Sequence, residues 1–317
     1  MLRVPHVLVL TGTLVLAATA ACPSAALGQL VPRPPITQQD WQLRTVRESG
    51  QPVIPIFEGW YPEENGTYSL CFGFFSLNRS EALHIPVGPD NFIEPARFDG
   101  SQPTHFSPLG ADGMTREYCV FTVNVPSDIA DERVWWNLQV DGHTYRVPGH
   151  ITARPWRVDN LVNSVAAASM GSEAEAPVAG SLVAPVVTLE GASGRVVRGK
   201  SGATAGELTV RAGSGLPITI SVALPEEDEL GDDLDPDEEG VLVRQLVKWT
   251  KFRGPEGVVR FSRDTIEFEL GPEPVEQTVM ATFREPGNYT LLAQVLSGSF
   301  SSQCCWTNAY VNVRVEQ

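Results

Sequence analysis

The first half of the chain carries histidines and carboxylates that could support chemistry. Four histidines occur within residues 52–155, at His84, His105, His143 and His150. Three or more imidazoles could converge on a metal ion, but their spacing matches no known ligand template. A hydrolase-type enzyme in this half would use His105, Asp90 or Glu58, which must then meet in one cleft. Scattered surface or turn histidines are the alternative interpretation.

Two motifs that would define a catalytic class are missing from the sequence. It contains no H-E-x-x-H zinc motif and no G-x-S-x-G nucleophile elbow. The sequence therefore favours a protein that binds over one that catalyses.

An acidic run at residues 226–239, EEDELGDDLDPDEE, contains ten acids and no base. Asp233, Asp235 and Asp237 have the 1, 3, 5 spacing of an EF-hand loop. An EF-hand is excluded, because Glu238 stands where glycine is required and Arg244 where glutamate is required. A looser calcium site and a solvated charge run are the remaining interpretations, so calcium is the one cofactor suggested.

Aromatic residues suggest a binding surface. Trp135 and Trp136 are adjacent in a predicted strand, so their side chains must point to opposite faces of the sheet. We expect one of them in the core and the other available to stack on a sugar or a protein partner. Trp60 could extend the same surface. Burial beneath a neighbouring loop is the alternative.

The cysteines predict one disulfide. Cys71 and Cys119 lie in strand-like stretches, and a bond between them would close a loop of roughly 48 residues. One detail opposes the pairing, because Cys119 alternates in phase with the apolar residues of its strand whereas Cys71 alternates out of phase. Two buried free thiols are the alternative. The adjacent Cys304 and Cys305 suggest a structural tie or a redox or metal site.

The N-terminus predicts export. Residues 1–28 have a basic start, a short apolar stretch and small residues, as secretory signals do. Cys22 would carry a lipid if the protein were a bacterial lipoprotein, although simple cleavage fits better. The formal net charge of −15, most of which lies in the acidic run, argues against nucleic acid and anionic lipid as partners. No later segment could span a membrane. We expect a secreted, periplasmic or cell-surface protein.

Alternation of apolar and polar residues predicts an all-β fold with two antiparallel β-sandwich domains of the immunoglobulin or fibronectin kind. A leader at residues 29–51 precedes the first domain, at 52–155, where Asp141-Gly142 predicts a tight hairpin. An Ala/Ser-rich linker follows at 156–183, and the second domain spans 184–317. The strands predicted in the first domain are Val53–Phe57, Thr67–Ser76, Ala82–Val87, Tyr118–Val125, Val134–Val140 and His143–Val147.

Part of the second domain resembles the PKD-type immunoglobulin-like modules of cell-surface proteins. The resemblance rests on Asp235-Pro236-Asp237, on Trp249 followed by Arg253-Gly254-Pro255-Glu256-Gly257, and on Pro286-Gly287-Asn288-Tyr289-Thr290-Leu291. It implies that Trp249 fills the space between two sheets and that Tyr289 is a corner tyrosine tied to upstream backbone. The first domain resembles uncharacterised secreted bacterial proteins with FEGW and IPVGPDNF segments, here residues 57–60 and 85–92.

The combined expectation is a non-catalytic exported protein that binds a protein or polysaccharide at the cell envelope. The alternatives are an accessory or structural subunit of an envelope assembly and, third, the hydrolase described above.

Overall fold

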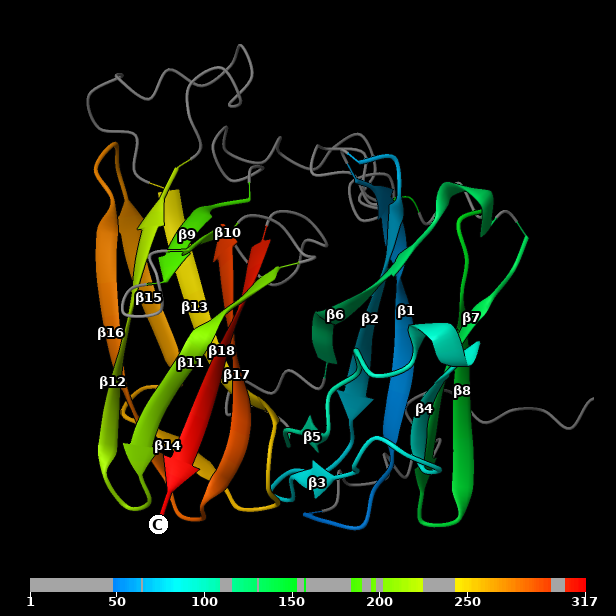
Figure 1. Cartoon of the computed structure of the whole chain (residues 1–317), viewed down its shortest axis with the longest axis horizontal. Helices are drawn as coiled ribbons and strands as arrows, with labels where there is room; N and C mark the ends of the chain where they lie inside the picture. The colour runs from blue at the N-terminus through cyan, green and yellow to red at the C-terminus, as the bar shows by residue number, and fades with distance from the viewer. Residues whose placement is uncertain are drawn as a thin grey trace, which may run out of the picture. The chain divides into compact units, whose positions relative to one another are not determined.

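The computed structural model describes residues 48–63, 65–108, 116–129, 131–152, 157, 184–189, 195–197, 202–224, 243–297 and 306–317. Residues 44–317 belong to one compact unit. Within the described residues the regular elements are strands, apart from two 3-10 turns at Ala96–Phe98 and Ser127–Ile129. The predicted all-β fold class is confirmed (Figure 1). No helix in this described part is long and apolar enough to cross a membrane.

The first sandwich is built from eight strands. They are β1 (Val53–Pro62), β2 (Tyr68–Ser76), β3 (Leu83–His84), β4 (Asn91–Glu94), β5 (His105–Phe106), β6 (Arg116–Val125), β7 (Val134–Val140) and β8 (His143–Gly149). One sheet has the order β1-β2-β6, the opposing sheet has the order β4-β7-β8, and β3 pairs with β5. Their inward side chains form a core rich in aromatic rings, in which Trp136 meets Phe121 edge to face with 4.9 Å between ring centroids.

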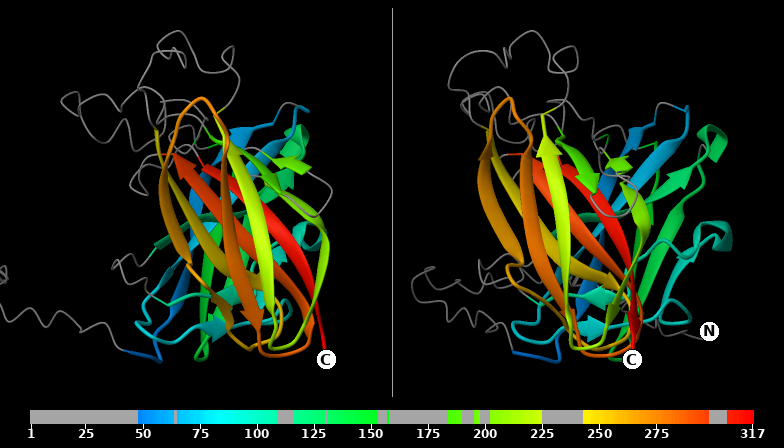
Figure 2. Two further views of the ribbon diagram at one scale, coloured as in Figure 1. Left: turned by 90° about the vertical axis from the view of Figure 1, so that its left-hand side faces the viewer. Right: turned by 60° about the vertical axis from the view of Figure 1, so that its left-hand side comes forward.

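The second sandwich is built from ten strands. They are β9 (Val186–Leu189), β10 (Arg195–Val197), β11 (Ala203–Arg211), β12 (Gly215–Ala223), β13 (Val243–Arg253), β14 (Val259–Phe261), β15 (Thr265–Leu270), β16 (Val275–Phe283), β17 (Gly287–Ser297) and β18 (Trp306–Glu316). Two five-stranded sheets, β10-β9-β12-β16-β14 and β11-β18-β17-β13-β15, form separate layers (Figure 2). All pairs are antiparallel except β11 with β18, which run parallel.

The alternating residues of the second sandwich are buried as their pattern predicts. Ile218, Ile220 and Val222 of β12 share one buried side. Trp249 is also buried in this core, as the resemblance implied. The Tyr289 hydroxyl donates to the Glu285 carbonyl oxygen at 2.9 Å, which confirms the tyrosine corner. These contacts explain why apolar residues recur at every second position in this half.

Two predictions for the first sandwich need correction. The strand predicted over Ala82–Val87 is reduced to Leu83–His84, because Pro86 lacks a backbone N–H for a sheet ladder. Strand β4 was missed because the sequence Gly88-Pro89-Asp90-Asn91 is typical of an exposed turn. Asn91 is instead completely buried, and its side-chain amide donates to the carbonyl oxygens of Ile85 and Pro103. A buried asparagine with both donors satisfied thus begins a strand here.

The predicted Cys71–Cys119 disulfide is present, with 5.1 Å between the two Cα atoms. The phase conflict disappears because β6 contains a bulge. Phe72 pairs with Phe121 and Phe74 pairs with Glu117, so three residues of β6 lie opposite the single residue Gly73. The bulge turns the Cys119 side chain to the opposite face from Phe121, with Cys119 in a left-handed conformation at φ 39°. A Cβ on Gly73 would lie 2.2 Å from the Glu117 carbonyl oxygen, so the bulge requires glycine there.

The same bulge joins the two sandwiches. Three successive carbonyl oxygens in it, those of Tyr118, Cys119 and Val120, accept hydrogen bonds from side chains of the second sandwich. The donors are Gln294 at 2.9 Å, Asn308 at 2.9 Å and the Tyr310 hydroxyl at 2.8 Å. The bulge removes these carbonyls from the normal ladder, and the junction satisfies them.

Charge and apolar contacts complete the junction. Lys248 Nζ of β13 lies 2.6 Å from Glu117 Oε1 of β6, and both side chains are largely buried. Phe252, Leu292 and Tyr310 of the second sandwich pack into the aromatic core of the first. Main-chain bonding crosses as well, since the Thr104 amide donates to the Phe252 carbonyl oxygen at 3.0 Å. The two sandwiches are therefore joined by a continuous buried contact.

Candidate functional site

The outward face of the β4-β7-β8 sheet gathers polar and aromatic side chains. Register pairs Trp135 with Glu94 of β4 and with Pro148 of β8, and pairs Asn137 with Arg146. Because strand side chains alternate, one set of residues shares this outward face. We call this set the Trp135 face; it comprises Phe92, Glu94, Trp135, Asn137, Gln139, Thr144, Arg146 and Pro148.

A stacked ion pair lies at the centre of the Trp135 face. The Arg146 guanidinium carbon lies 3.9 Å from the centroid of the Trp135 ring. Arg146 Nη2 also lies 2.8 Å from Glu94 Oε2, with about half of each of these two side chains exposed. Asn137 Nδ2 donates to the Trp135 carbonyl oxygen at 3.2 Å. The face thus presents planar hydrogen-bonding groups held in fixed orientations by neighbouring strands.

Trp135 and Trp136 point to opposite faces of the sheet, as their adjacency predicts. Trp135 is partly exposed, whereas Trp136 is completely buried and its Nε1 donates to Asn91 Oδ1 at 3.0 Å. Trp136 therefore has no ring surface to offer a ligand. Trp60 lies in the opposing sheet, where it is buried against Tyr68, so it does not extend the Trp135 face. Of the three tryptophans predicted to bind, Trp135 alone lies on this surface.

Sequence reasoning missed Arg146 and Glu94. The position of Arg146 could have been deduced, because a two-residue Asp141-Gly142 turn fixes which residues of the hairpin face one another. Glu94 could not, since its strand was not predicted.

Two of the histidines considered for a chemical role, His84 and His105, form a pair. His84 and His105 are directly opposite each other on β3 and β5. The Nδ1 atom of each is buried and has no hydrogen-bond partner among the described residues. Burial, with help from Lys251 and His84, lowers the pKa of His105 to about 3. An imidazole held neutral in this way is a core residue more than a proton shuttle.

The carboxylates of the enzyme hypothesis do not join this pair. Asp90 is exposed, and within the described part of the chain its recorded hydrogen bond is the one that its carbonyl oxygen accepts from the Gln139 amide. Glu58 is buried and forms an ion pair with Arg116, whose Nε donates at 3.1 Å. Burial raises the pKa of Glu58, and Arg116 opposes that shift. The structure therefore does not assemble His105, Asp90 and Glu58 into one site.

The predicted calcium ligands Asp233, Asp235 and Asp237 lie outside the described residues, as do Cys22, Cys304 and Cys305. The calcium site stays a prediction. Among the residues that are described, no three histidine, cysteine or acidic side chains come together as a metal site would need.

A sequence match to the phosphate-binding loop pattern was also missed. Residues 194–201, GRVVRGKS, fit G-x-x-x-x-G-K-S. Their central part, Arg195–Val197, is strand β10 and pairs antiparallel with β9. A phosphate loop must instead curl its backbone amides around the anion, between a strand and a helix. The match is therefore not supported by its structural context.

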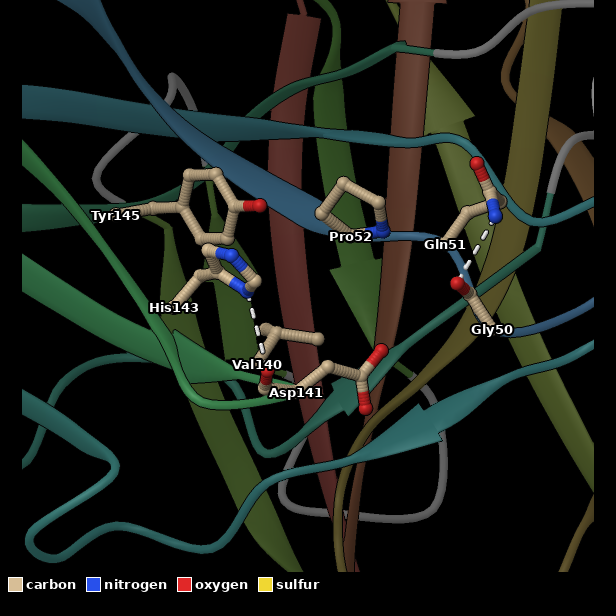
Figure 3. A pocket seen from close by; sticks show the side chains of 7 residues that line it. All are labelled: Gly50, Gln51, Pro52, Val140, Asp141, His143 and Tyr145. Atoms are coloured by element: carbon tan, nitrogen blue, oxygen red, sulfur yellow. Dashed lines mark hydrogen bonds between the residues drawn. The ribbon is translucent and has the colours of Figure 1, made fainter. Parts of the chain in front are cut away.

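A pocket of about 340 Å³ lies where the chain enters β1 (Figure 3). It is lined by Gly50, Gln51, Pro52, Val140, Asp141, His143 and Tyr145. Its polar groups are engaged locally, since His143 Nδ1 lies 3.0 Å from the Asp141 carbonyl oxygen and Gln51 Nε2 donates to Gly50. The pocket holds no opposed charges or buried donors directed at a ligand, so we regard it as a weaker candidate than the Trp135 face.

The described residues form two β-sandwiches, and their regular elements are strands apart from two 3-10 turns. No protein-family profile matches it, and no curated protein is similar to it in sequence. Among solved structures, the D0-D1 domain of intimin has 13% identity and a TM-score of 0.24, over 83% of this chain and 97% of that one. Domains 4 and 5 of the S-layer protein SbsC have 12% identity and a TM-score of 0.21, over 58% and 65%.

A C. elegans MSP family member, WR4, has 7% identity and a TM-score of 0.22, over 35% of this chain and 92% of that one. These are distant similarities among sandwich domains. At such scores they support no argument about function.

Proposed function

We propose that this is a non-catalytic exported protein that binds a glycan at the cell surface or envelope through the Trp135 face. The observation that supports this proposal is the exposed Trp135–Arg146–Glu94 cluster on a regular sheet. Its side chains come from three adjacent strands, so their spacing is set by the sheet and needs no ligand to form.

The chemistry of the face favours a glycan over a protein partner. Sugars offer hydroxyl groups that both donate and accept, and the exposed side chains of Glu94, Gln139, Thr144 and Arg146 match them with both functions. Protein interfaces bury an apolar core. The large apolar side chains exposed in the described residues are Val87, Val258 and Met280, none of which belongs to the Trp135 face. A polar ligand is therefore the better fit.

Export is supported by the Cys71–Cys119 disulfide, because such bonds persist in oxidising compartments. Residues 1–28 would be the signal that directs it there, and the second sandwich would be of the PKD type. We propose the signal and the PKD type of the second sandwich together with the binding role.

The test is affinity electrophoresis of the purified protein through gels containing envelope polysaccharide from its own host. We expect retardation, and we expect Arg146→Ala to lower the affinity about tenfold, because a charged hydrogen bond contributes roughly 1.5–3 kcal/mol. Arg97→Ala is the matched control. Arg97 also stacks on an aromatic ring, Phe98, and pairs with a glutamate, Glu132, but it lies off the Trp135 face.

Equal loss of retardation in the two variants, or free migration of the wild type in every polysaccharide, would contradict the proposal. An accessory subunit of an envelope assembly is the second candidate. The buried junction favours it, because a spacer must hold its domains in a fixed relation. Recovery of one stoichiometric protein partner from the host envelope, with wild type and Arg146→Ala alike, would support that candidate.

A further inference from the structure

A second cavity lies where the two sandwiches meet, and none of the residues that line it belongs to the Trp135 face. Its volume is about 360 Å³, within the usual range of about 300–1,000 Å³ for small-molecule sites. Domain junctions are common places for such sites. We call this cavity the junction cleft; its lining includes Ser101, Thr122, Phe252, Arg253, Thr290 and Tyr310.

The junction cleft contains a cation, Arg253, that forms no salt bridge with the described residues. Arg253 Nε donates to the Gln102 carbonyl oxygen at 2.8 Å, and Nη2 donates to the Gly100 carbonyl oxygen at 2.6 Å. Within the described residues, Nη1 makes no hydrogen bond and the guanidinium forms no ion pair. The nearby Asp99 carboxylate acts on Arg253 only through space, and its Oδ1 accepts hydrogen bonds from Gln102 Nε2 and from the Ile93 amide. An arginine stays charged at neutral pH, so the cleft offers a positive charge to an anion.

Hydroxyl groups line the same cleft. Ser101 Oγ is buried and has no hydrogen-bond partner among the described residues. Such a group is costly unless a ligand or water satisfies it. The Thr290 hydroxyl donates to Asn312 Oδ1 at 2.9 Å, which leaves its oxygen able to accept from a ligand. Thr122 adds a third hydroxyl from β6. This lining is suited to a molecule that carries several hydroxyl groups.

Aromatic rings form the apolar part of the cleft. Phe252 and Tyr310 lie with their ring centroids 5.1 Å apart. The Tyr310 hydroxyl is already committed to the Val120 carbonyl oxygen at 2.8 Å, so its ring contributes apolar surface. The C–H face of a sugar ring packs well on such a surface.

We propose that the junction cleft binds a carboxylated sugar residue of the uronate class. The carboxylate would pair with the unengaged edge of Arg253, the sugar hydroxyls would satisfy Ser101, Thr122 and Thr290, and the ring would lie against Phe252. This site is separate from the Trp135 face and does not depend on the function proposed for it. The cleft lies between the domains, so occupation would also strengthen their contact.

The test is isothermal titration calorimetry of the purified protein with D-glucuronate, D-glucose and acetate. We expect glucuronate to bind at least tenfold more tightly than either glucose or acetate. Glucose lacks the carboxylate that would pair with Arg253, and acetate lacks the sugar ring and its hydroxyl groups. Arg253→Ala would remove junction hydrogen bonds, so Ser101→Ala and Thr122→Val are the informative variants. Each should weaken glucuronate binding by about threefold to tenfold, the worth of one hydrogen bond.

Ser101→Ala separates binding from folding. Its hydroxyl has no partner in the described structure, so the unfolding midpoint of the variant should equal or exceed that of the wild type. Ser76→Ala is the matched control, because Ser76 Oγ is also buried without a partner but lies outside the cleft. Ser76→Ala and Arg146→Ala should both retain glucuronate binding. Equal affinity for glucose and glucuronate, no binding of either, or unchanged binding in Ser101→Ala would each overturn the proposal.

Discussion

Replacing both Cys71 and Cys119 by alanine tests whether the two sandwiches unfold together. The disulfide spans a sequence separation of 48 residues within the first sandwich and lies beside the bulge that contacts the second. Its loss therefore destabilises the first sandwich directly. The second sandwich is affected only if the junction transmits the change.

The size of the effect depends on how much of the chain melts in one step. In the chain-entropy model a loop of this length corresponds to about 4 kcal/mol. Unfolding entropy is about 2.1 cal/mol/K per residue, so a cooperative unit of roughly 200 ordered residues would lose about 10 °C in Tm. A first sandwich of roughly 100 residues melting alone would lose about 20 °C. The small cavities left by two sulfur atoms add to both cases alike.

Differential scanning calorimetry distinguishes these cases. We expect one transition in the wild type and one in the double variant, about 10 °C lower. Two resolved transitions, with only the lower one displaced and by about 20 °C, would refute the inference that the junction couples the sandwiches. A thiol reductant should lower the Tm of the wild type by about 10 °C and leave the Tm of the double variant nearly unchanged. This comparison controls for effects at other cysteines.

Three further outcomes are expected. Gly73→Ala should lower the free energy of unfolding in urea by about 3 kcal/mol, because its methyl group would overlap the Glu117 carbonyl oxygen, and wild-type stability would contradict the bulge geometry. Tyr289→Phe should cost about 1 kcal/mol in the same assay through loss of the bond to Glu285, and no change would argue against the corner. The His105 pKa of about 3 means that only the unfolded chain takes up this proton as the pH falls from 6.5, so stability drops by up to about 1.4 kcal/mol per pH unit. His105→Gln should flatten this decline between pH 6 and pH 4. Parallel curves of stability against pH for the two proteins would contradict a lowered pKa for His105.

Local patterns predicted the strands best where one side of a sheet is buried. Val134–Val140 was predicted to the residue, because its buried side chains alternate and the turn after it has a strong signal. The Tyr289 corner followed from a motif whose contacts lie within a few residues. Such features depend on residues that are close in sequence, so one sequence is enough to predict them.

The junction could not be predicted, because its partners are remote in sequence and ordinary in type. Gln294 and Asn308 lie in strands that alternate normally, so nothing marks them as donors to carbonyls near residue 119. The bulge itself appeared only as a conflict of phase around Cys119. That conflict was the one available signal, and its cause needed the pairing register.

The hydrogen bonds across the bulge have a practical consequence for any attempt to divide the protein. A protease that cuts the chain between residues 152 and 184 would sever the covalent connection but leave the three carbonyl contacts and the shared apolar core intact. The two fragments should therefore migrate together under native conditions and separate only in denaturant. The second sandwich produced by itself would expose Phe252 and Tyr310, and the first would expose the apolar surface that covers them. Each half should therefore aggregate alone or bind the other half when the two are mixed.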